Sequence, residues 1–222
     1  ASHTPPSQEW RYAQGLDGGD MIKSLILGTL LWSGALMAIE QPSYTVLKDY
    51  GEGIEMRQYA AYIIAETEIS AANADQAGNL AFKRLGGYIF GGNRSKQSLA
   101  MTAPVSQAKS EKIAMTAPVS QARKNEGVWL VSFVMPKEYT LETLPVPDDP
   151  KVYFRTVPAR KVLAIRFSGR WTDASFNQHE TELLAALKTH GLKSTGAAWT
   201  ARYDPPFMPG FMRRNEVMIQ LR

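Results

Sequence analysis

The sequence Ala-Met-Thr-Ala-Pro-Val-Ser-Gln-Ala occupies residues Ala100–Ala108 and recurs unchanged at Ala114–Ala122. Corresponding positions of the two copies are fourteen residues apart, too few for each copy to fold as a repeat unit of its own. In both copies every second residue is apolar, so that these residues would lie on one face of an extended segment. This alternation is typical of a half-buried strand. The repeat therefore predicts two extended segments side by side, joined by the polar turn Lys109–Lys112. The shared faces are expected to carry Leu99, Met101, Ala103 and Val105 in the first segment, and Ile113, Met115, Ala117 and Val119 in the second.

Each predicted segment contains a proline at the same place, Pro104 in the first copy and Pro118 in the second. Proline has no backbone N–H to donate, so within a sheet it is confined to edge strands and bulges. We therefore expect an irregular, bulged sheet in this region rather than a flat one.

The composition is that of a globular protein with one sizeable domain, with or without a tail. The chain has 222 residues, of which 44% are hydrophobic and 10% aromatic. Its formal net charge of +4 is spread along the sequence, and no run of Lys and Arg marks a nucleic-acid-binding patch. Cysteine is absent, which excludes disulfides and any metal or haem ligation by a thiolate.

The N-terminal region has the features of a targeting segment. From Met21 a short charged start leads into an apolar run between Leu25 and Ile39. We predict a disordered extension at residues 1–20, a signal peptide at 21–38 that begins at Met21, and the folded domain at 39–222. The run is shorter than the roughly 20 residues that span a bilayer, so a periplasmic or secreted protein is favoured. A membrane anchor formed by the same segment is the alternative.

Beyond Pro42 the sequence alternates between strand and helix patterns. The first predicted helix has Asn73 or Asp75 as its N-cap and ends near Phe90, and the second has Asp173 as its N-cap and ends at Gly191. The order strands, helix, strands occurs twice, which predicts a pseudo-symmetric α+β domain with two helices on one curved antiparallel sheet. The predicted strands are residues 44–50, 54–59, 62–70, 128–135, 152–157, 162–167, 199–203 and 216–221.

Several motifs, taken in their order, resemble those of the SOUL haem-binding protein family. They are the paired Met-Thr-Ala-Pro-Val, Phe90–Asn93, Tyr203–Pro206 and Arg213–Glu216, and the resemblance runs from about Tyr44 to the C-terminus. It implies a distorted antiparallel β-barrel-like sheet flanked by two long helices, a fold related to bacterial effector-binding domains. It also implies non-covalent binding of haem or another tetrapyrrole.

The first predicted helix offers one surface for such a ligand, and the resemblance places the porphyrin groove near this helix. Its inner face is expected to carry residues at helical spacing, namely Gly78, Phe82, Leu85 and Ile89. On the outer face, an exposed leucine would meet the ring, an arginine would pair with a carboxylate, and a glycine would leave room. The predicted binding residues of this helix are Leu80, Arg84, Gly87 and Tyr88. The alternative is that a single exposed leucine needs no explanation.

The loop that begins at Tyr203 is rich in proline and unusually apolar. We predict that Phe207 and Met208 form a wall of the ligand site together with Phe211, with Arg202 or Arg213 near the rim. Family members can carry a basic residue at the position of Met208, so a contact to a carboxylate is not expected from that residue. For Arg213–Glu216 the favoured interpretation is structural, with polar side chains that satisfy the turn before the last strand.

The sequence does not supply an obvious axial ligand for haem iron, which favours His, Met, Cys or Tyr. In some family members a proposed ligand histidine precedes the tyrosine of a Glu-x-Arg-x-Tyr pattern, and Gln58 stands there in this chain. His179 and His190 lie near the apolar stripe of the second helix and are interpreted as flank or core residues. Met101 and Met115 are interpreted as core residues. No metal site is predicted.

No metalloprotease, nucleophile-elbow, phosphate-loop or dinucleotide-binding motif is present in the sequence. The favoured function is therefore a non-catalytic protein that binds haem, or another flat, apolar, anionic small molecule, in a shallow groove without a strong axial ligand. One alternative is a small-molecule hydrolase with Glu66, Glu68 or Glu216 as a buried base. Another is a protein-interaction module that uses residues 207–211 and the second helix. No nucleic-acid partner is predicted, and membrane contact is expected only through the N-terminal segment.

Overall fold

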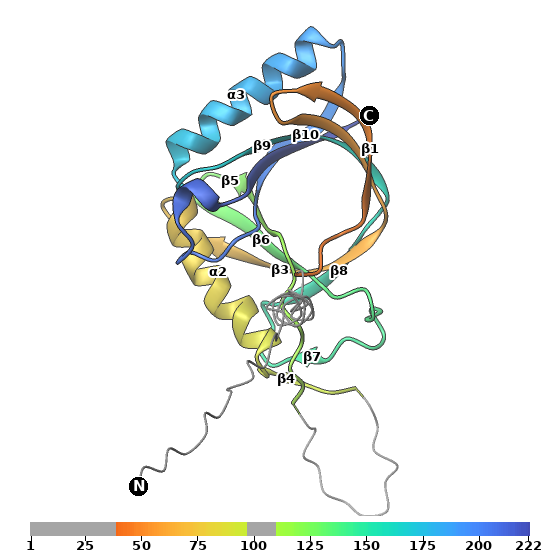
Figure 1. Cartoon of the computed structure of the whole chain (residues 1–222). Helices are drawn as coiled ribbons and strands as arrows, with labels where there is room; N and C mark the ends of the chain where they lie inside the picture. The colour runs from red at the N-terminus through yellow and green to blue at the C-terminus, as the bar shows by residue number, and fades with distance from the viewer. Residues whose placement is uncertain (1–38, 97–109) are drawn as a thin grey trace, which may run out of the picture. The chain divides into compact units, whose positions relative to one another are not determined.

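Nine antiparallel strands form one strongly curved sheet, and two helices pack against its outer face (Figure 1). The computed structural model describes residues 39–96 and 110–222. The elements of this part of the chain are β1 (Tyr44–Gly51), β2 (Ile54–Tyr59), β3 (Tyr62–Ser70), α2 (Ala74–Ile89), β4 (Asn93–Arg94), β5 (Val119–Asn125), β6 (Val128–Val134), β7 (Val146–Pro147), β8 (Tyr153–Val157), β9 (Arg160–Phe167), α3 (Asp173–Thr189), β10 (Ser194–Arg202), the short 3-10 helix η1 (Gly210–Met212) and β11 (Asn215–Leu221).

The strand order in the large sheet is β1-β2-β9-β11-β10-β5-β6-β3-β8. The strands curve round a ring in Figure 1, but the two end strands, β1 and β8, do not pair, so the sheet is open rather than a closed barrel. β4 and β7 form a separate two-stranded ribbon. The predicted α+β class, the curved antiparallel sheet and the two flanking helices are confirmed.

Side chains alternate between the two faces of the sheet, as the period of two requires. On β9, Leu163 and Ile165 pack beneath α3, whereas Val162 and Ala164 belong to a separate cluster on the helix-free face. On β11, Val217 and Ile219 face α3, and Met218 belongs to the cluster on the helix-free face. The sheet therefore buries apolar residues on both faces, although helices cover only one of them.

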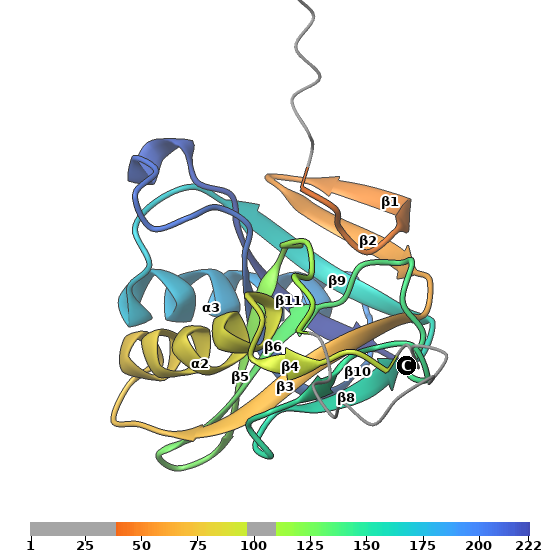
Figure 2. The same ribbon diagram turned by 90° about the horizontal axis from the view of Figure 1, so that it is seen from below.

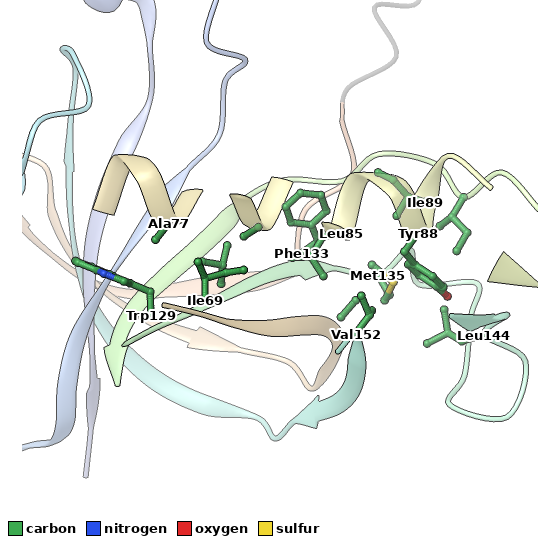
Figure 3. Close-up of a cluster of buried hydrophobic side chains, with 14 of the residues drawn as sticks. Ile69, Ala77, Leu85, Tyr88, Ile89, Trp129, Phe133, Met135, Leu144 and Val152 are labelled. Atoms are coloured by element: carbon green, nitrogen blue, oxygen red, sulfur yellow. The ribbon is translucent and has the colours of Figure 1, made fainter. Parts of the chain in front are cut away.

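Asn73 is the N-cap of helix α2, and its Oδ1 accepts a hydrogen bond from the Gln76 backbone N–H at 2.9 Å. Of the two predicted caps, Asn73 is the correct one. Figure 3 shows the buried side of α2 over β3 and β6, with Leu85 and Ile89 directed into the cluster as predicted. The predicted inner face is partly wrong, because Phe82 is 45% exposed. The small side chains of Ala77 and Ala81 occupy the sheet-facing positions instead, and both are completely buried.

The N-cap of helix α3 lies one residue earlier than predicted. Thr172 is the N-cap, with its side chain accepting from the Ser175 N–H at 3.1 Å, so Asp173 lies in the first turn. A negative charge there favours the helix N-terminus electrostatically. The predicted apolar stripe is confirmed by the burial of Phe176, Leu183 and Leu187. Figure 2 shows α2 and α3 side by side on the same face of the sheet.

The second copy of the sequence repeat is only partly a strand. Residues 111–118 have no regular strand, and β5 starts at Val119, directly after Pro118, which has no N–H to donate. Thr116 forms an isolated bridge to Glu40. Of the predicted inner face, Ile113 and Ala117 are buried, but Met115 is exposed, which corrects its assignment as a core residue. The first copy, and with it the pairing of the two copies, lies outside the described residues.

The predicted extension and signal peptide at residues 1–38 also lie outside the described residues. Within the part of the chain that the structure describes, neither α2 nor α3 is long and apolar enough to span a membrane.

Candidate functional site

Of the predicted binding residues on α2, some are exposed to solvent and others already contact partners within the protein. Leu80 is 46% exposed, and a Cβ added at Gly87 would meet no atom within 4 Å, so both positions are open as expected. Arg84, however, forms an ion pair with Asp149 at 2.9 Å. Its guanidinium also donates to the Thr67 hydroxyl at 2.9 Å. A ligand carboxylate on α2 would have to compete with these partners for Arg84.

Tyr88 lies in the core rather than on the predicted binding surface. Its side chain is 2% exposed, and its hydroxyl donates to the Pro145 carbonyl at 3.1 Å (Figure 3). Burial raises the pKa of Tyr88 well above its ordinary value. A ligand lying on the outer surface of α2 would therefore not contact this ring unless the helix moved.

The loop between β10 and β11 is held in shape by its own polar groups. Asp204 accepts a hydrogen bond from the Arg214 backbone N–H at 2.5 Å, across the base of the loop. The guanidinium of Arg213 donates to the Met208 carbonyl at 2.7 Å and also to the Pro206 carbonyl. Arg213 therefore braces the loop, which agrees with a structural role for this motif. Phe207, at 85% exposed, extends from this braced loop into solvent.

A cleft of about 480 Å³ lies where this loop meets the N-terminal ends of both helices. In Figures 1 and 2 this loop lies beside the segment that leads from β9 into α3. The cleft brings together the predicted residues Phe207 and Met208, but not Leu80, Arg84, Gly87 or Tyr88. Its lining residues are Asp75, Arg170, Trp171, Thr172, Phe207, Met208, Pro209, Gly210 and Arg213.

Two arginines lie against the indole of Trp171 at this cleft. The guanidinium carbons of Arg202 and Arg213 lie 4.6 Å and 4.8 Å from the indole centre, within the range of cation–π attraction. Trp171 itself is fixed by a hydrogen bond from its Nε1–H to the Asn215 side-chain oxygen at 2.6 Å. Arg170 is exposed and lines the cleft, and among the described residues it has no ion-pair or hydrogen-bond partner.

Arg202 is a half-buried cation with no carboxylate within ion-pair distance among the described residues. Its Nε is buried without a hydrogen-bond acceptor, and desolvation lowers the pKa of Arg202. Asp75 and Asp173 act on it only through longer-range attraction, which opposes that shift. The cleft lining itself carries Arg170 and Arg213 against one carboxylate, Asp75, and Arg202 adds a positive charge behind Trp171, so the net charge favours an anionic group.

The sequence prediction missed Arg170 and Trp171. A local signal was present, because these two residues stand directly before the helix N-cap Thr172. What the sequence could not give is their proximity to Phe207, since 36 residues separate Trp171 from Phe207 along the chain.

Candidate iron ligands are sparse near the cleft. His179 stacks on Phe167 with ring centres 3.7 Å apart, and its Nδ1 lies 2.7 Å from the Ser175 carbonyl. His190 packs on Tyr50 at 4.2 Å. Neither histidine lines the cleft, whereas the thioether of Met208 does. Among the described residues, no group of three or more His, Asp or Glu residues could hold a metal ion.

Gln58, at the position of the family's proposed ligand histidine, pairs with Lys161 at the start of β9. The cleft adjoins the other end of that strand, where Phe167 precedes Arg170 by three residues. Six residues of extended strand cover about 20 Å. Even a ligating side chain at Gln58 would therefore lie far from a ring bound in this cleft.

The carboxylates considered as catalytic bases are largely occupied. Glu216 is completely buried and accepts bonds from Arg57 at 2.8 Å and 3.1 Å, from Arg214 at 2.8 Å and from the Tyr203 hydroxyl at 2.8 Å. Glu66 is buried too, and both of its oxygens accept from Arg155, at 2.7 Å and 3.0 Å. Glu68 is half exposed and paired with Lys124.

A family model described as "SOUL heme-binding protein" matches residues 39–220. The chain is 28% identical to "Heme-binding protein 1" of Mus musculus over 156 residues, which covers 70% of this chain and 77% of that protein. It is 26% identical to "Heme-binding protein 2" of Homo sapiens over 190 residues, covering 83% and 87%. Among solved structures, the crystal structure of EcmrR C-terminal domain matches with a TM-score of 0.53 at 9% identity, covering 81% of this chain and 98% of that one. At that identity the likeness shows a shared fold.

Proposed function

Because the chain belongs to the SOUL heme-binding protein family, whose model spans residues 39–220, we propose that it binds haem or a related tetrapyrrole without covalent attachment. The proposed site is the cleft between the loop that follows β10 and the start of α3. The observation that carries this choice is the combination of Trp171, Phe207 and Met208 on the walls with the unpaired Arg170 at the surface.

The residues of the cleft fit such a ligand in size and polarity. Its volume of about 480 Å³ lies within the range of roughly 300–1,000 Å³ found for small-molecule sites. Its aromatic and thioether side chains offer apolar surface, and each Å² of apolar area removed from water contributes about 25 cal/mol. The guanidinium of Arg170 is free to bind a carboxylate in a bidentate manner, which is the geometry that suits arginine.

Met208 is the one candidate axial ligand among the residues that line this cleft. We propose that the ring is held mainly by its faces and carboxylates, with at most a thioether at the iron. Bound haem would supply iron redox chemistry, but the residues described here offer binding and orientation. Because Arg155 and Arg57 already occupy the oxygens of Glu66 and Glu216, a non-catalytic role is the proposal that these contacts favour.

The test is a haemin titration of the full-length protein, followed by the Soret absorption, with variants of the cleft. Arg170→Glu reverses the charge at the rim, and Phe207→Asp places a carboxylate on the apolar wall. Each should weaken haemin binding by roughly tenfold or more, as expected when a charged hydrogen bond or an aromatic contact is lost. Both residues are exposed, so neither change should unfold the protein.

Two control variants make the experiment specific. Arg94→Glu reverses another exposed arginine, which is paired with Asp148 away from the cleft, and should leave the titration unchanged. Leu80→Asp tests the α2 surface separately. If haemin binding is lost in Leu80→Asp and retained in the two cleft variants, the outer face of α2 is the site and the cleft assignment is wrong. If the wild-type protein shows no saturable Soret change, the haem proposal itself fails.

We also propose, from the sequence alone, that residues 21–38 direct export and are removed. The motivating feature is the charged start at Met21 followed by the apolar run that begins at Leu25. Intact-mass measurement of the protein recovered from its natural source tests this. A mature N-terminus near residue 39 is expected, and an uncleaved chain in the membrane fraction would support the anchor alternative.

A further inference from the structure

A second cavity, of about 140 Å³, lies on the helix-free face of the sheet. The pairing register forms it, because Ser120 on β5 lies opposite Ser132 on β6, which lies opposite Glu66 on β3. Trp199 on β10 and Arg160 at the start of β9 complete the wall. The apolar part of its lining comes from Ile64, Ala122, Leu130 and Val157.

Arg160 is the unusual member of this lining. Its guanidinium carbon lies 4.5 Å from the ring centre of Trp199. Its Nη2 donates to the Tyr62 hydroxyl at 3.0 Å, and its Nη1 lies 3.4 Å from the Gln220 side-chain oxygen. The Nε–H is buried and has no acceptor, and no carboxylate lies within 4 Å of the group among the described residues.

The neighbouring charges do not compensate Arg160. The other arginine of the cavity, Arg155, is paired through two hydrogen bonds with Glu66, the one carboxylate of the lining. The lining therefore contains two arginines and one glutamate, a net charge of +1. A buried cationic N–H without an acceptor is unfavourable, since burial removes it from water without replacing the lost hydrogen bond.

Hydroxyl groups accompany this unsatisfied donor. The side chains of Ser120 and Ser132 line the cavity without a hydrogen-bond partner among the described residues, and the Tyr62 hydroxyl accepts from Arg160 but has no acceptor for its own proton there. These groups and the Arg160 Nε–H are all donors to an anion with several acceptor oxygens.

From this arrangement we propose that the helix-free face holds a second ligand site, which binds a small organic carboxylate through Arg160. The carboxylate accepts from the Arg160 guanidinium and from the hydroxyls, while its apolar body lies against Leu130, Val157 and Trp199. The size is restrictive, because an engineered cavity of about 150 Å³ in another protein holds one benzene molecule. The ligand is therefore a monocarboxylate with a body no larger than a single ring, and a tetrapyrrole is too large.

The site is independent of the proposed haem cleft. The cleft lies at the N-terminal ends of the helices on the other face of the sheet, and the two cavities share no lining residue. Failure of one proposal therefore leaves the other intact, provided that both ligands are tested on each variant.

Benzoate is the probe, with benzamide as its uncharged counterpart of equal shape, and binding to the full-length protein is measured by isothermal titration calorimetry. Benzoate should bind saturably and benzamide roughly tenfold or more weaker, because the difference reports the charged hydrogen bonds. Arg160→Gln should remove this preference. The matched control is Arg123→Gln, since Arg123 also stacks on a tryptophan, Trp129 at 4.9 Å, but outside the cavity, and it should bind benzoate as wild type does.

A second variant protects the test against a folding defect in Arg160→Gln. Ala122→Leu fills the cavity without changing its charge and should also abolish benzoate binding, while thermal unfolding and the haemin titration stay as in wild type. The proposal is overturned by an absence of saturable benzoate binding to wild type, or by equal binding of benzoate and benzamide. Benzoate binding that survives in a folded Arg160→Gln or Ala122→Leu protein would overturn it as well.

Discussion

Glu216 on β11 is bound through both carboxylate oxygens by Arg57 on β2, at 2.8 Å and 3.1 Å, although the two residues are 159 positions apart in the chain. Both side chains are almost completely inaccessible, at 0% and 1% exposed. The pair lies on strands separated in the sheet by β9, so it ties the first hairpin to the last strand. Coulomb attraction and burial oppose each other in such pairs, and removing one partner leaves an uncompensated buried charge.

Replacing Glu216 by Ala should therefore cost about 3–5 kcal/mol in the free energy of unfolding. The control is Lys124→Ala, which breaks the exposed pair with Glu68 and should cost less than about 1 kcal/mol. Urea unfolding followed by circular dichroism measures both. Equal, small losses in the two variants would show that the buried pair does not hold the hairpin to the last strand.

The turn between β1 and β2 offers a matched pair of glycine substitutions. Gly51 and Gly53 both have positive φ, at 83° and 78°, but only a Cβ at Gly53 would lie 2.6 Å from a backbone atom, the Arg166 carbonyl oxygen. Gly51→Ala should cost about 1–2 kcal/mol for the left-handed conformation alone, and Gly53→Ala distinctly more. If the two variants have the same thermal midpoint, the close approach to β9 is not a constraint on this turn.

The corrected inner face of α2 makes a prediction about its apolar residues. Leu85→Ala removes a completely buried side chain and should cost about 2–5 kcal/mol. Phe82→Ala, at a position 45% exposed, should cost clearly less despite removing more atoms. If both residues pointed inward, as the sequence predicted, the two variants would lose comparable amounts of unfolding free energy. Chemical denaturation of the two variants therefore decides between the assignments.

Burial and the nearby Glu216 raise the pKa of Tyr59 from 10.0 to about 12. A group whose pKa is higher in the folded state stabilises that state fully at pH values below its unfolded pKa. This stabilisation is lost as the pH rises through the folded pKa. Stability should therefore fall between about pH 10 and pH 12. Tyr59→Phe should show a shallower fall than wild type in this window when the two are compared by urea unfolding. Parallel slopes would mean that other tyrosines dominate the alkaline transition.

The sequence predicted the elements of the fold well because most of their signals are local. Asn73 caps α2 through a contact three residues away, and the strand periodicity of β3 and β11 is visible within each segment. The family assignment was also predicted correctly, because its motifs stand in order along the chain. The N-cap of α3 was misassigned by one residue because Thr172 and Asp173 are both good caps, and only the backbone conformation distinguishes them.

The site was harder to predict because it depends on contacts between distant segments. Helical periodicity correctly placed Arg84 away from the sheet. It could not reveal the ion-pair partner Asp149, which lies 65 residues further along the chain. Phe207 and Met208 were identified from their unusual apolar loop. Arg170 and Trp171 could be recognised as cleft residues only in the folded structure, where the pairing of β9 with β11 brings them close to that loop.

The most direct test of the haem cleft is hydrogen–deuterium exchange of the full-length protein with and without one equivalent of haemin. Haemin should slow exchange in peptides covering residues 203–214 and 169–175, with little change in α2 at residues 79–87. Protection confined to α2, or no protection of the loop at haemin concentrations that saturate the Soret signal, would contradict the assignment of the ligand to this cleft.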